Sequence, residues 1–203
     1  IGFDIAANPA ELVKSIPVGR GDRVLSFAEL GEYLTSLGDD PTDCALRLAL
    51  LAGGQRMAQV VRATVRDWDG TTLRLTDPKG RRTRPREHLL PLAPLGAELV
   101  ERLAARARLR GVPWLLSTTS GPLDPQTPGK RVSEISARMG GDPFGLRDIR
   151  RTAETMLTGL KVNKETLAQL LSHGISGVQA AHYDRHSYFD EKQAALLPWE
   201  THL

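Results

Sequence analysis

Two arginines spaced three residues apart are the most informative chemical feature of this 203-residue sequence. Arg147 and Arg150 fall within a segment of helical periodicity, so their side chains project from one face of the helix. Two guanidinium groups held so close repel each other unless an anion lies between them, and a phosphate can accept forked hydrogen bonds from both. The alternative interpretation is a solvated basic face paired with Asp148 or Glu154.

Four more residues of chemically useful types lie along the chain. Arg56 follows a Gly-Gly break, where its side chain can turn into a cleft. Lys79 lies in an Asp-Pro-Lys-Gly turn, His173 stands at the end of a predicted helix, and Tyr183 follows ten residues later. Taken singly, a turn lysine is usually solvated and a helix-end histidine is usually structural, because its charge favours a helix C-terminus.

The order of these residues resembles that of the tyrosine recombinases of the phage-integrase type. Arg147-Asp-Ile-Arg-Arg-Thr152 is similar to the family's His-x-x-Arg motif, which is usually followed by Arg-Thr, and Arg150 matches the motif arginine. Leu170-Leu-Ser-His-Gly174 resembles the Leu-Leu-Gly-His box, with His173 at the histidine of the box. Tyr183 stands about where the family places its nucleophile.

Two upstream segments extend the resemblance over residues 50 to 185. Leu50-Leu-Ala-Gly-Gly-Gln-Arg56 is similar to the family's first arginine box, and Leu75-Thr-Asp-Pro-Lys-Gly-Arg-Arg82 resembles the β-hairpin that delivers its catalytic lysine. The resemblance implies DNA cleavage and rejoining through a 3′-phosphotyrosine, with no metal, ATP or other cofactor. The catalytic residues that it implies are Tyr183, Arg56, Lys79, Arg150, His173 and Arg147.

Two positions depart from the family pattern. Arg147 replaces the usual His or Lys, and an arginine stays protonated at any workable pH, so it binds a phosphate oxygen but is a poor proton shuttle. Gln59 stands where the family often has Glu. A catalytically weakened DNA-binding relative is therefore the alternative function, and a type IB topoisomerase, which shares the tyrosine chemistry, is a third. Tyr188 is a second candidate nucleophile.

The charge pattern predicts double-stranded DNA as the partner. Lys and Arg exceed Asp and Glu by 27 − 24 = 3, and the predicted hairpin is strongly basic. Basic residues release condensed counterions when they meet phosphates, although charge can also serve only to protect a solvated sheet edge. Besides Lys79, the predicted DNA-binding residues are Arg81, Arg82, Arg84 and Arg86.

The resemblance also implies the biological setting. It predicts integration or excision of a phage or genomic island at attachment sites, a homotetramer on DNA, a monomer for the isolated domain, and a bacterial cytoplasm where the active enzyme associates with the nucleoid. An apolar stripe from Phe189 to Trp199 either docks onto a neighbouring protomer, as the family often does, or packs within its own chain.

Other classes of protein are disfavoured. The single cysteine, Cys44, allows no intramolecular disulfide and no cysteine-rich zinc site, which favours a reducing compartment. The longest apolar stretches, such as Leu46–Ala52, are far shorter than the roughly 20 residues that span a bilayer. His182 and His186 have a metal-ligand spacing, but no third ligand is evident, so we expect no metal site.

Helical periodicity with one change to a period of two predicts an α+β, mainly helical fold with a small antiparallel sheet, a hairpin at about 68–92, packed on a helical core. Residues 1–25, which begin without an initiator Met, read as a linker arm after a missing N-terminal core-binding domain, and 26–203 as the catalytic domain. Ser26 and Glu29 form a predicted capping box. Helices are predicted near 11–16 and at 27–37, 42–51, 57–65, 96–110, 132–139, 146–160, 164–171, 178–183 and from 190.

Overall fold

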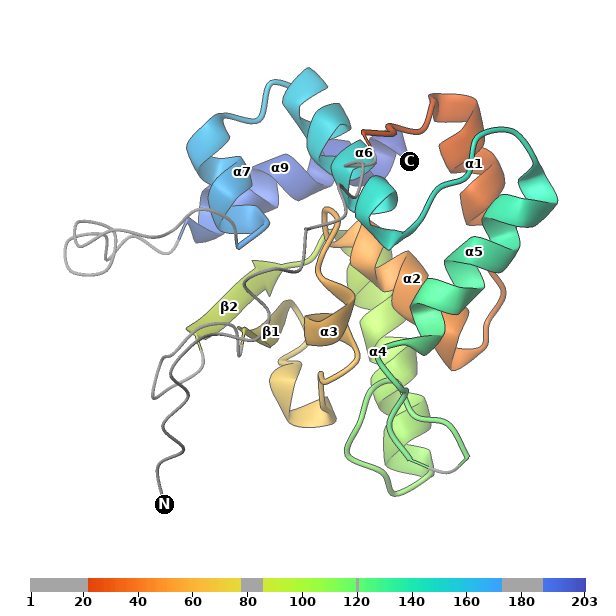
Figure 1. Ribbon diagram of the computed structural model, residues 1–203. Helices are drawn as coiled ribbons and strands as arrows, with labels where there is room; N and C mark the ends of the chain where they lie inside the picture. The colour runs from red at the N-terminus through yellow and green to blue at the C-terminus, as the bar shows by residue number, and fades with distance from the viewer. Residues whose placement is uncertain (1–21, 78–85, 120, 173–187) are drawn as a thin grey trace, which may run out of the picture.

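Helix α2 (Pro41–Leu51) is the central element of the helical body in the computed structural model, which describes residues 22–77, 86–119, 121–172 and 188–203. The Asp40 carboxylate caps the helix by accepting from the amides of Thr42 and Asp43. Most of its residues are buried on all sides, and it packs against α3, α4, α5, α6 and α9. Figure 1 shows these helices around it, with the two strands at one edge.

Helices α1 (Phe27–Thr35) and α5 (Thr127–Met139) lie side by side on one flank of α2 (Figure 1). The predicted capping box of α1 is confirmed, because Ser26 Oγ accepts from the Glu29 amide while the Glu29 carboxylate accepts from the Ser26 amide. Helix α5 begins five residues earlier than predicted. Pro128 lies in its first turn, where the missing N–H of proline has no intrahelical partner to lose.

Strands β1 (Thr72–Asp77) and β2 (Arg86–Pro91) form the predicted antiparallel hairpin. Leu73 pairs with Leu90 and Leu75 pairs with His88, and these four side chains are buried on one face. The predicted fold class, mainly helical with a small antiparallel sheet, is therefore confirmed. Residues 78–85, between the strands, lie outside the described residues.

The helix predicted over residues 57–65 is wrong in its second half. Helix α3 spans only Met57–Val60, and a short 3-10 turn follows at Val65–Asp67. The backbone between them pairs with another segment instead, since the Val65 amide donates to the Pro113 carbonyl and the Leu115 amide donates to the Ala63 carbonyl. Tertiary pairing thus outweighs the helical periodicity, helped by β-branched residues of modest helix propensity.

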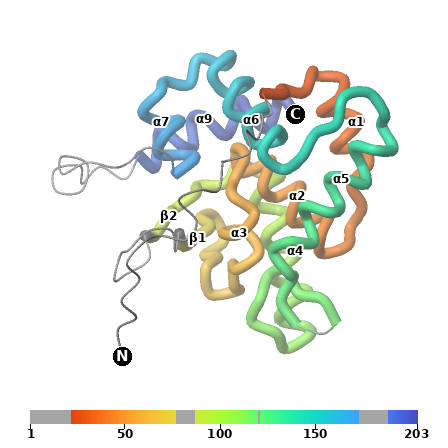
Figure 2. Tube along the Cα trace, in the orientation of Figure 1, coloured from red at the N-terminus to blue at the C-terminus, as the bar shows by residue number. Residues whose placement is uncertain are grey.

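Four more helices belong to the part of the body that the structure describes: α4 (Pro94–Leu109), α6 (Leu146–Gly159), α7 (Lys164–Leu170) and α9 (Phe189–His202). Helices α7 and α9 run next to each other, as Figure 2 shows. Leu196 and Trp199 of α9 are fully buried, and Trp199 Nε1 donates to the Leu50 carbonyl at 2.8 Å. Of the two alternatives for this apolar stripe, the described helix therefore packs within its own chain.

The N-terminal end of the described chain joins the same body. Leu25 is buried, and its amide donates to Thr152 Oγ1 on α6 at 2.9 Å. The helices predicted near 11–16 and at 178–183 lie outside the described residues, and the division of the chain at residue 25 stays a prediction. Within the described ranges, no helix combines the length and apolar character needed to cross a bilayer.

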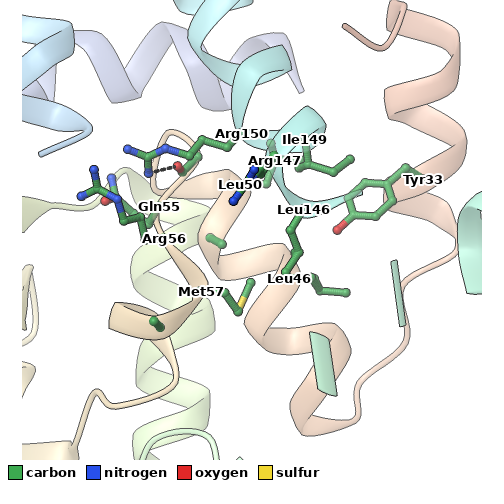
Figure 3. A pocket seen from close by; sticks show the side chains of 13 residues that line it. Tyr33, Leu46, Leu50, Gln55, Arg56, Met57, Leu146, Arg147, Ile149 and Arg150 are labelled. Atoms are coloured by element: carbon green, nitrogen blue, oxygen red, sulfur yellow. Dashed lines mark hydrogen bonds between the residues drawn. The ribbon is translucent and has the colours of Figure 1, made fainter. Parts of the chain in front are cut away.

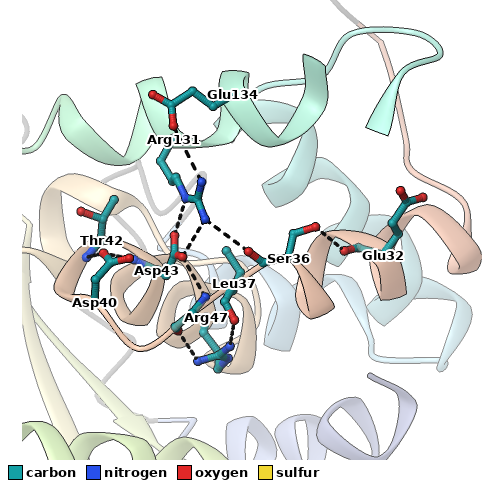
Figure 4. Close-up of polar contacts among 10 residues, drawn as sticks. Glu32, Ser36, Leu37, Asp40, Thr42, Asp43, Arg47, Arg131 and Glu134 are labelled. Atoms are coloured by element: carbon teal, nitrogen blue, oxygen red, sulfur yellow. Dashed lines mark hydrogen bonds and ion pairs between the residues drawn. The ribbon is translucent and has the colours of Figure 1, made fainter. Parts of the chain in front are cut away.

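An ion pair between a buried carboxylate and a partly buried guanidinium joins α2 to α5 (Figure 4). Arg131 on α5 donates to both carboxylate oxygens of Asp43, at 2.7 and 2.8 Å, and to the Ser36 carbonyl at 3.2 Å. Burial by itself raises the pKa of Asp43, but hydrogen bonds from Arg131 and the Gly38 amide, together with the Arg131 charge, bring that pKa below its ordinary value. Asp43 therefore stabilises the fold as a carboxylate.

We predict that Asp43→Asn lowers the free energy of unfolding by about 2 to 3 kcal/mol at neutral pH, because it leaves a largely buried guanidinium without its counter-charge. Because the pKa is lowered by folding, the stabilisation is present above the ordinary carboxyl pKa of 3.8 and is lost as the pH falls through the folded value. Urea unfolding from pH 7 down to pH 3 measures the difference between the two proteins.

Asp39→Asn is the matched control. Asp39 pairs with Arg102 at 3.1 Å, but its side chain is 63% exposed, so its loss should cost less than about 1 kcal/mol at every pH. Equal effects of the two substitutions would contradict the role given to the buried pair.

Candidate active site

The C-terminal end of α7 is the point where the candidate site residues meet. The last carbonyls of a helix have no partner within the helix. Here the Leu170 carbonyl accepts from Gln55 Nε2 at 2.9 Å and lies 3.0 Å from His88 Nε2. A carbonyl can only accept, so the Nε2 atom of His88 has to bear the proton. Strand β2 and the segment before α3 are thereby fixed to this end of α7.

The two arginines of the predicted phosphate clamp contact the next two carbonyls. Arg150 Nη2 donates to the Leu171 carbonyl at 2.6 Å, and Arg56 Nη1 donates to the Ser172 carbonyl at 3.2 Å. Arg150 also donates through Nη1 to the Gly54 carbonyl at 2.7 Å. Figure 3 shows the two guanidinium groups close together. The structure thus brings together two residues that are 94 positions apart (150 − 56) in the sequence.

The Gly-Gly break before Arg56 makes this geometry attainable. Gly53 and Gly54 have φ values of 82° and 90°, which residues with a side chain rarely adopt. A Cβ atom on Gly54 would lie 2.9 Å from the Cβ of Ala153, so α6 approaches the loop too closely for any side chain at this position. The two glycines therefore allow the loop to place Arg56 beside Arg150.

Arg147 lines the same pocket as Arg56 and Arg150 but is exposed to solvent. The ion pair on this part of α6 joins Arg151 to Asp148, at 2.9 Å. In the alternative interpretation, Asp148 would neutralise Arg147 or Arg150. The structure instead pairs Asp148 with Arg151.

Several predicted residues lie outside the described residues. These are Lys79, Arg81, Arg82, Arg84, His173 and Tyr183, and also His182 and His186. Arg86 is the first residue of β2. In the ranges that the structure describes, no group of three or more His, Cys, Asp or Glu side chains is arranged to hold a metal ion.

Tyr188, the second candidate nucleophile, lies near the other end of α7. Its hydroxyl donates to the carboxylate of Glu165 in the first turn of that helix. The arginines contact carbonyls six and seven residues further along, and at about 1.5 Å per residue this corresponds to roughly 9 Å. The contact with Glu165 therefore holds the Tyr188 hydroxyl away from the arginine pair.

Two residues of this site were not identified from the sequence. Gln55 stands directly before Arg56, and His88 shares the buried face of the hairpin with Leu90. A polar residue at an inward position of an alternating strand is the signal that could have identified His88, because a buried imidazole needs a hydrogen-bond partner. Gln55 left no comparable signal, since its buried position depends on the loop conformation.

The fold is shared with solved tyrosine recombinase structures. The XerA recombinase superposes with a TM-score of 0.63 at 16% identity, over 85% of this chain and 62% of that one. The integrase of mycobacterium phage Brujita superposes with a TM-score of 0.64 at 16% identity, over 90% of this chain and 58% of the integrase. The lambda integrase catalytic core superposes with a TM-score of 0.56 at 16% identity, over 77% of this chain and 94% of the catalytic core.

These likenesses define the fold as that of the tyrosine recombinase catalytic domain. The chain spans about three fifths of the length of the XerA and Brujita proteins, but it corresponds to nearly the whole lambda catalytic core. Other structures with this fold were determined with DNA bound. No model of a protein family matches the sequence, and no curated protein matches it at the sequence level.

We predict that Ser172→Gly stabilises the protein. Ser172 follows α7 with φ of 55°, in the left-handed region, and its buried hydroxyl has no hydrogen-bond partner among the described residues. Glycine avoids the cost of this backbone conformation, so the free energy of unfolding should rise by about 1 kcal/mol. Thermal unfolding measures the change.

Ser36→Gly is the matched control at the end of α1. Ser36 has φ of −76°, and its hydroxyl donates to the Glu32 carbonyl, so the same substitution there should destabilise the protein. A loss of stability in both variants would show that Ser172 is not strained.

Proposed function

We propose that this chain is the catalytic domain of a tyrosine recombinase, which cleaves and rejoins DNA through a 3′-phosphotyrosine on Tyr183. The observation that supports this best is the convergence of Arg56 and Arg150 at the end of α7, on the residues directly before His173. Two guanidinium groups fixed side by side present forked donors that suit the two unesterified oxygens of a phosphodiester.

The proposed chemistry begins with neutralisation of the phosphate charge. Arg56 and Arg150 bind the anionic oxygens and stabilise the charge that develops in the transition state. The phenolic oxygen of Tyr183 attacks phosphorus, and the bond from phosphorus to the 5′ oxygen breaks. A phenol has an ordinary pKa near 10, so the neighbouring cations, including His173, assist by stabilising the phenolate.

The leaving 5′ oxygen takes a proton from Lys79, which acts as the general acid. A free 5′ hydroxyl of another strand then attacks the phosphotyrosine and restores both the phosphodiester and the phenol. The energy of the broken bond is retained in the ester, so the cycle needs neither ATP nor a metal. In both steps the nucleophile has to stand in line with the leaving oxygen.

The proposed partner is double-stranded DNA at attachment sites, contacted by Lys79, Arg81, Arg82, Arg84 and Arg86 of the hairpin. The DNA-bound structures of the same fold support a DNA partner. We further propose a tetramer on DNA, a monomer for the isolated domain, and integration or excision of a phage or genomic island in a bacterial cytoplasm.

The second candidate function is DNA binding with weakened catalysis. Arg147 favours it, because an exposed arginine at this position binds phosphate but exchanges protons poorly. The two candidates differ in whether a covalent intermediate forms.

We predict that a nicked duplex with the attachment site, taken from the genomic junctions of the element, yields a covalent adduct on denaturing gels. Tyr183→Phe should abolish the adduct, because it removes the attacking oxygen, and should leave DNA binding within about twofold. Tyr188→Phe is the matched control and should retain the adduct. An adduct that survives in Tyr183→Phe would remove Tyr183 from its role, and salt-sensitive binding without any adduct would favour the second candidate.

We also predict that Arg147→His raises the rate of adduct formation by about tenfold or more near pH 7, because an imidazole can transfer protons that a guanidinium cannot. The pH dependence of the rate should then gain a group titrating near pH 6.5, in addition to any contribution of His173, which both proteins share. A rate equal to that of the parent at every pH would mean that Arg147 does not limit the reaction.

A further inference from the structure

A pocket of about 260 Å³ opens beside the arginine pair and is not explained by phosphate binding. It lies among α2, α3 and α6 (Figure 3). A DNA phosphate needs only the guanidinium groups, whereas most of the lining of this pocket is apolar. The main apolar side chains that line it are Leu46, Leu50, Met57, Leu146 and Ile149. An apolar pocket of this kind is the usual environment of a small organic ligand.

Tyr33 of α1 brings a polar group to the apolar part of this pocket. Its side chain is fully buried, and its hydroxyl has no hydrogen-bond partner in the part of the chain that the structure describes. In Figure 3 the hydroxyl points toward Leu146, which also lines the pocket. A buried hydroxyl without a partner is rare and costly in folded proteins, so this position suits a ligand that offers an acceptor.

The Tyr33 hydroxyl acts as a donor. Burial raises the pKa of Tyr33 well above its ordinary value, and the nearby negative charge of Asp43 raises it further. The phenol is therefore protonated throughout the range in which proteins are handled. It can donate a hydrogen bond to a hydroxyl or carbonyl oxygen of the ligand.

Arg147 brings the complementary charge to the same pocket. Its side chain is exposed, and it forms no ion pair or hydrogen bond with the described residues. A guanidinium fork matches a carboxylate in geometry, and an Arg–carboxylate pair is stronger than one between neutral groups. The pocket thus combines a donor for a neutral oxygen, apolar walls and a cation for an anionic head.

We propose that this pocket binds a small aromatic carboxylate with its rings against the apolar walls, its carboxylate on Arg147 and a polar oxygen on the Tyr33 hydroxyl. An inorganic anion would leave the walls uncovered, and a neutral hydrocarbon would leave Tyr33 unpaired. Because Arg56 and Arg150 line the same pocket, the bound carboxylate places negative charge beside the proposed phosphate site and competes with DNA. Binding of the carboxylate does not depend on strand cleavage, and every residue that contacts it belongs to the described part of the chain.

The test is calorimetric titration of the full chain, without DNA, with 6-hydroxy-2-naphthoate and with 2-naphthoate. The parent should bind the hydroxylated probe about fivefold more tightly, the effect of one neutral hydrogen bond. Tyr33→Phe should remove this preference and retain binding of 2-naphthoate. Arg147→Gln should weaken both probes by about tenfold, because both lose a charge-assisted contact.

Arg151→Gln is the matched control, since Arg151 lies on the same helix, pairs with Asp148 and does not line the pocket. It should leave both affinities within about twofold, and thermal unfolding should verify that all variants fold. Absence of binding to the parent, or a preference that persists in Tyr33→Phe, would overturn the proposal. So would equal losses in the two arginine variants.

A second measurement separates this inference from the proposed function. In a DNA-binding titration, 6-hydroxy-2-naphthoate should weaken the affinity of the parent for duplex DNA, and should do so less in Tyr33→Phe. Binding of the probe with unchanged DNA affinity would overturn the competition. Loss of covalent adduct formation alone would contradict only the proposed function, since the calorimetric result does not depend on strand cleavage.

Discussion

The structure of the site depends on the unpaired carbonyls at the end of α7. A helix leaves its last carbonyls without internal partners, and the partial negative charge there attracts cations. Gln55 and His88 contact the first of these carbonyls, and Arg150 and Arg56 contact the next two. These side chains come from the loop before α3, from β2 and from α6. The contacts that end one short helix therefore also assemble the basic site.

The same contacts explain how two guanidinium groups can lie together before any anion binds. The repulsion between neighbouring arginines on α6 suggested a phosphate between Arg147 and Arg150. The fold instead directs Arg150 toward the carbonyls of Gly54 and Leu171, while Arg147 stays exposed. The close pair is Arg56 with Arg150, and carbonyl dipoles offset its repulsion. Such a pair is oriented in advance for the phosphate that we propose it binds, which lowers the reorganisation that binding would require.

The residues that stabilise the fold of this protein are largely different from those that line the candidate site. The backbone matches the solved recombinases at 14 to 18% identity, which shows how little of the sequence the fold requires. Arg147, which departs from the family pattern, lies on the pocket lining, and Ser172 lies beside the arginine contacts. A change in chemistry at these positions leaves the packing of α2, α6 and α9 intact, because neither side chain belongs to the core.

Most of the helices, the hairpin and the arginines of the candidate site could be predicted from the sequence. Apolar periodicity, caps and glycine breaks are local signals, so the hairpin, most helices and the two arginine boxes could be read directly. The prediction of a helix at residues 61–65 failed because backbone groups of Ala63 and Val65 form hydrogen bonds with the distant segment at Pro113–Leu115. The partners that meet in space could not be predicted in this way. Gln55 and His88 contact the Leu170 carbonyl, Tyr33 lines the pocket, and α9 packs on its own chain. Such contacts join residues up to 149 positions apart, and no periodicity within one segment records them.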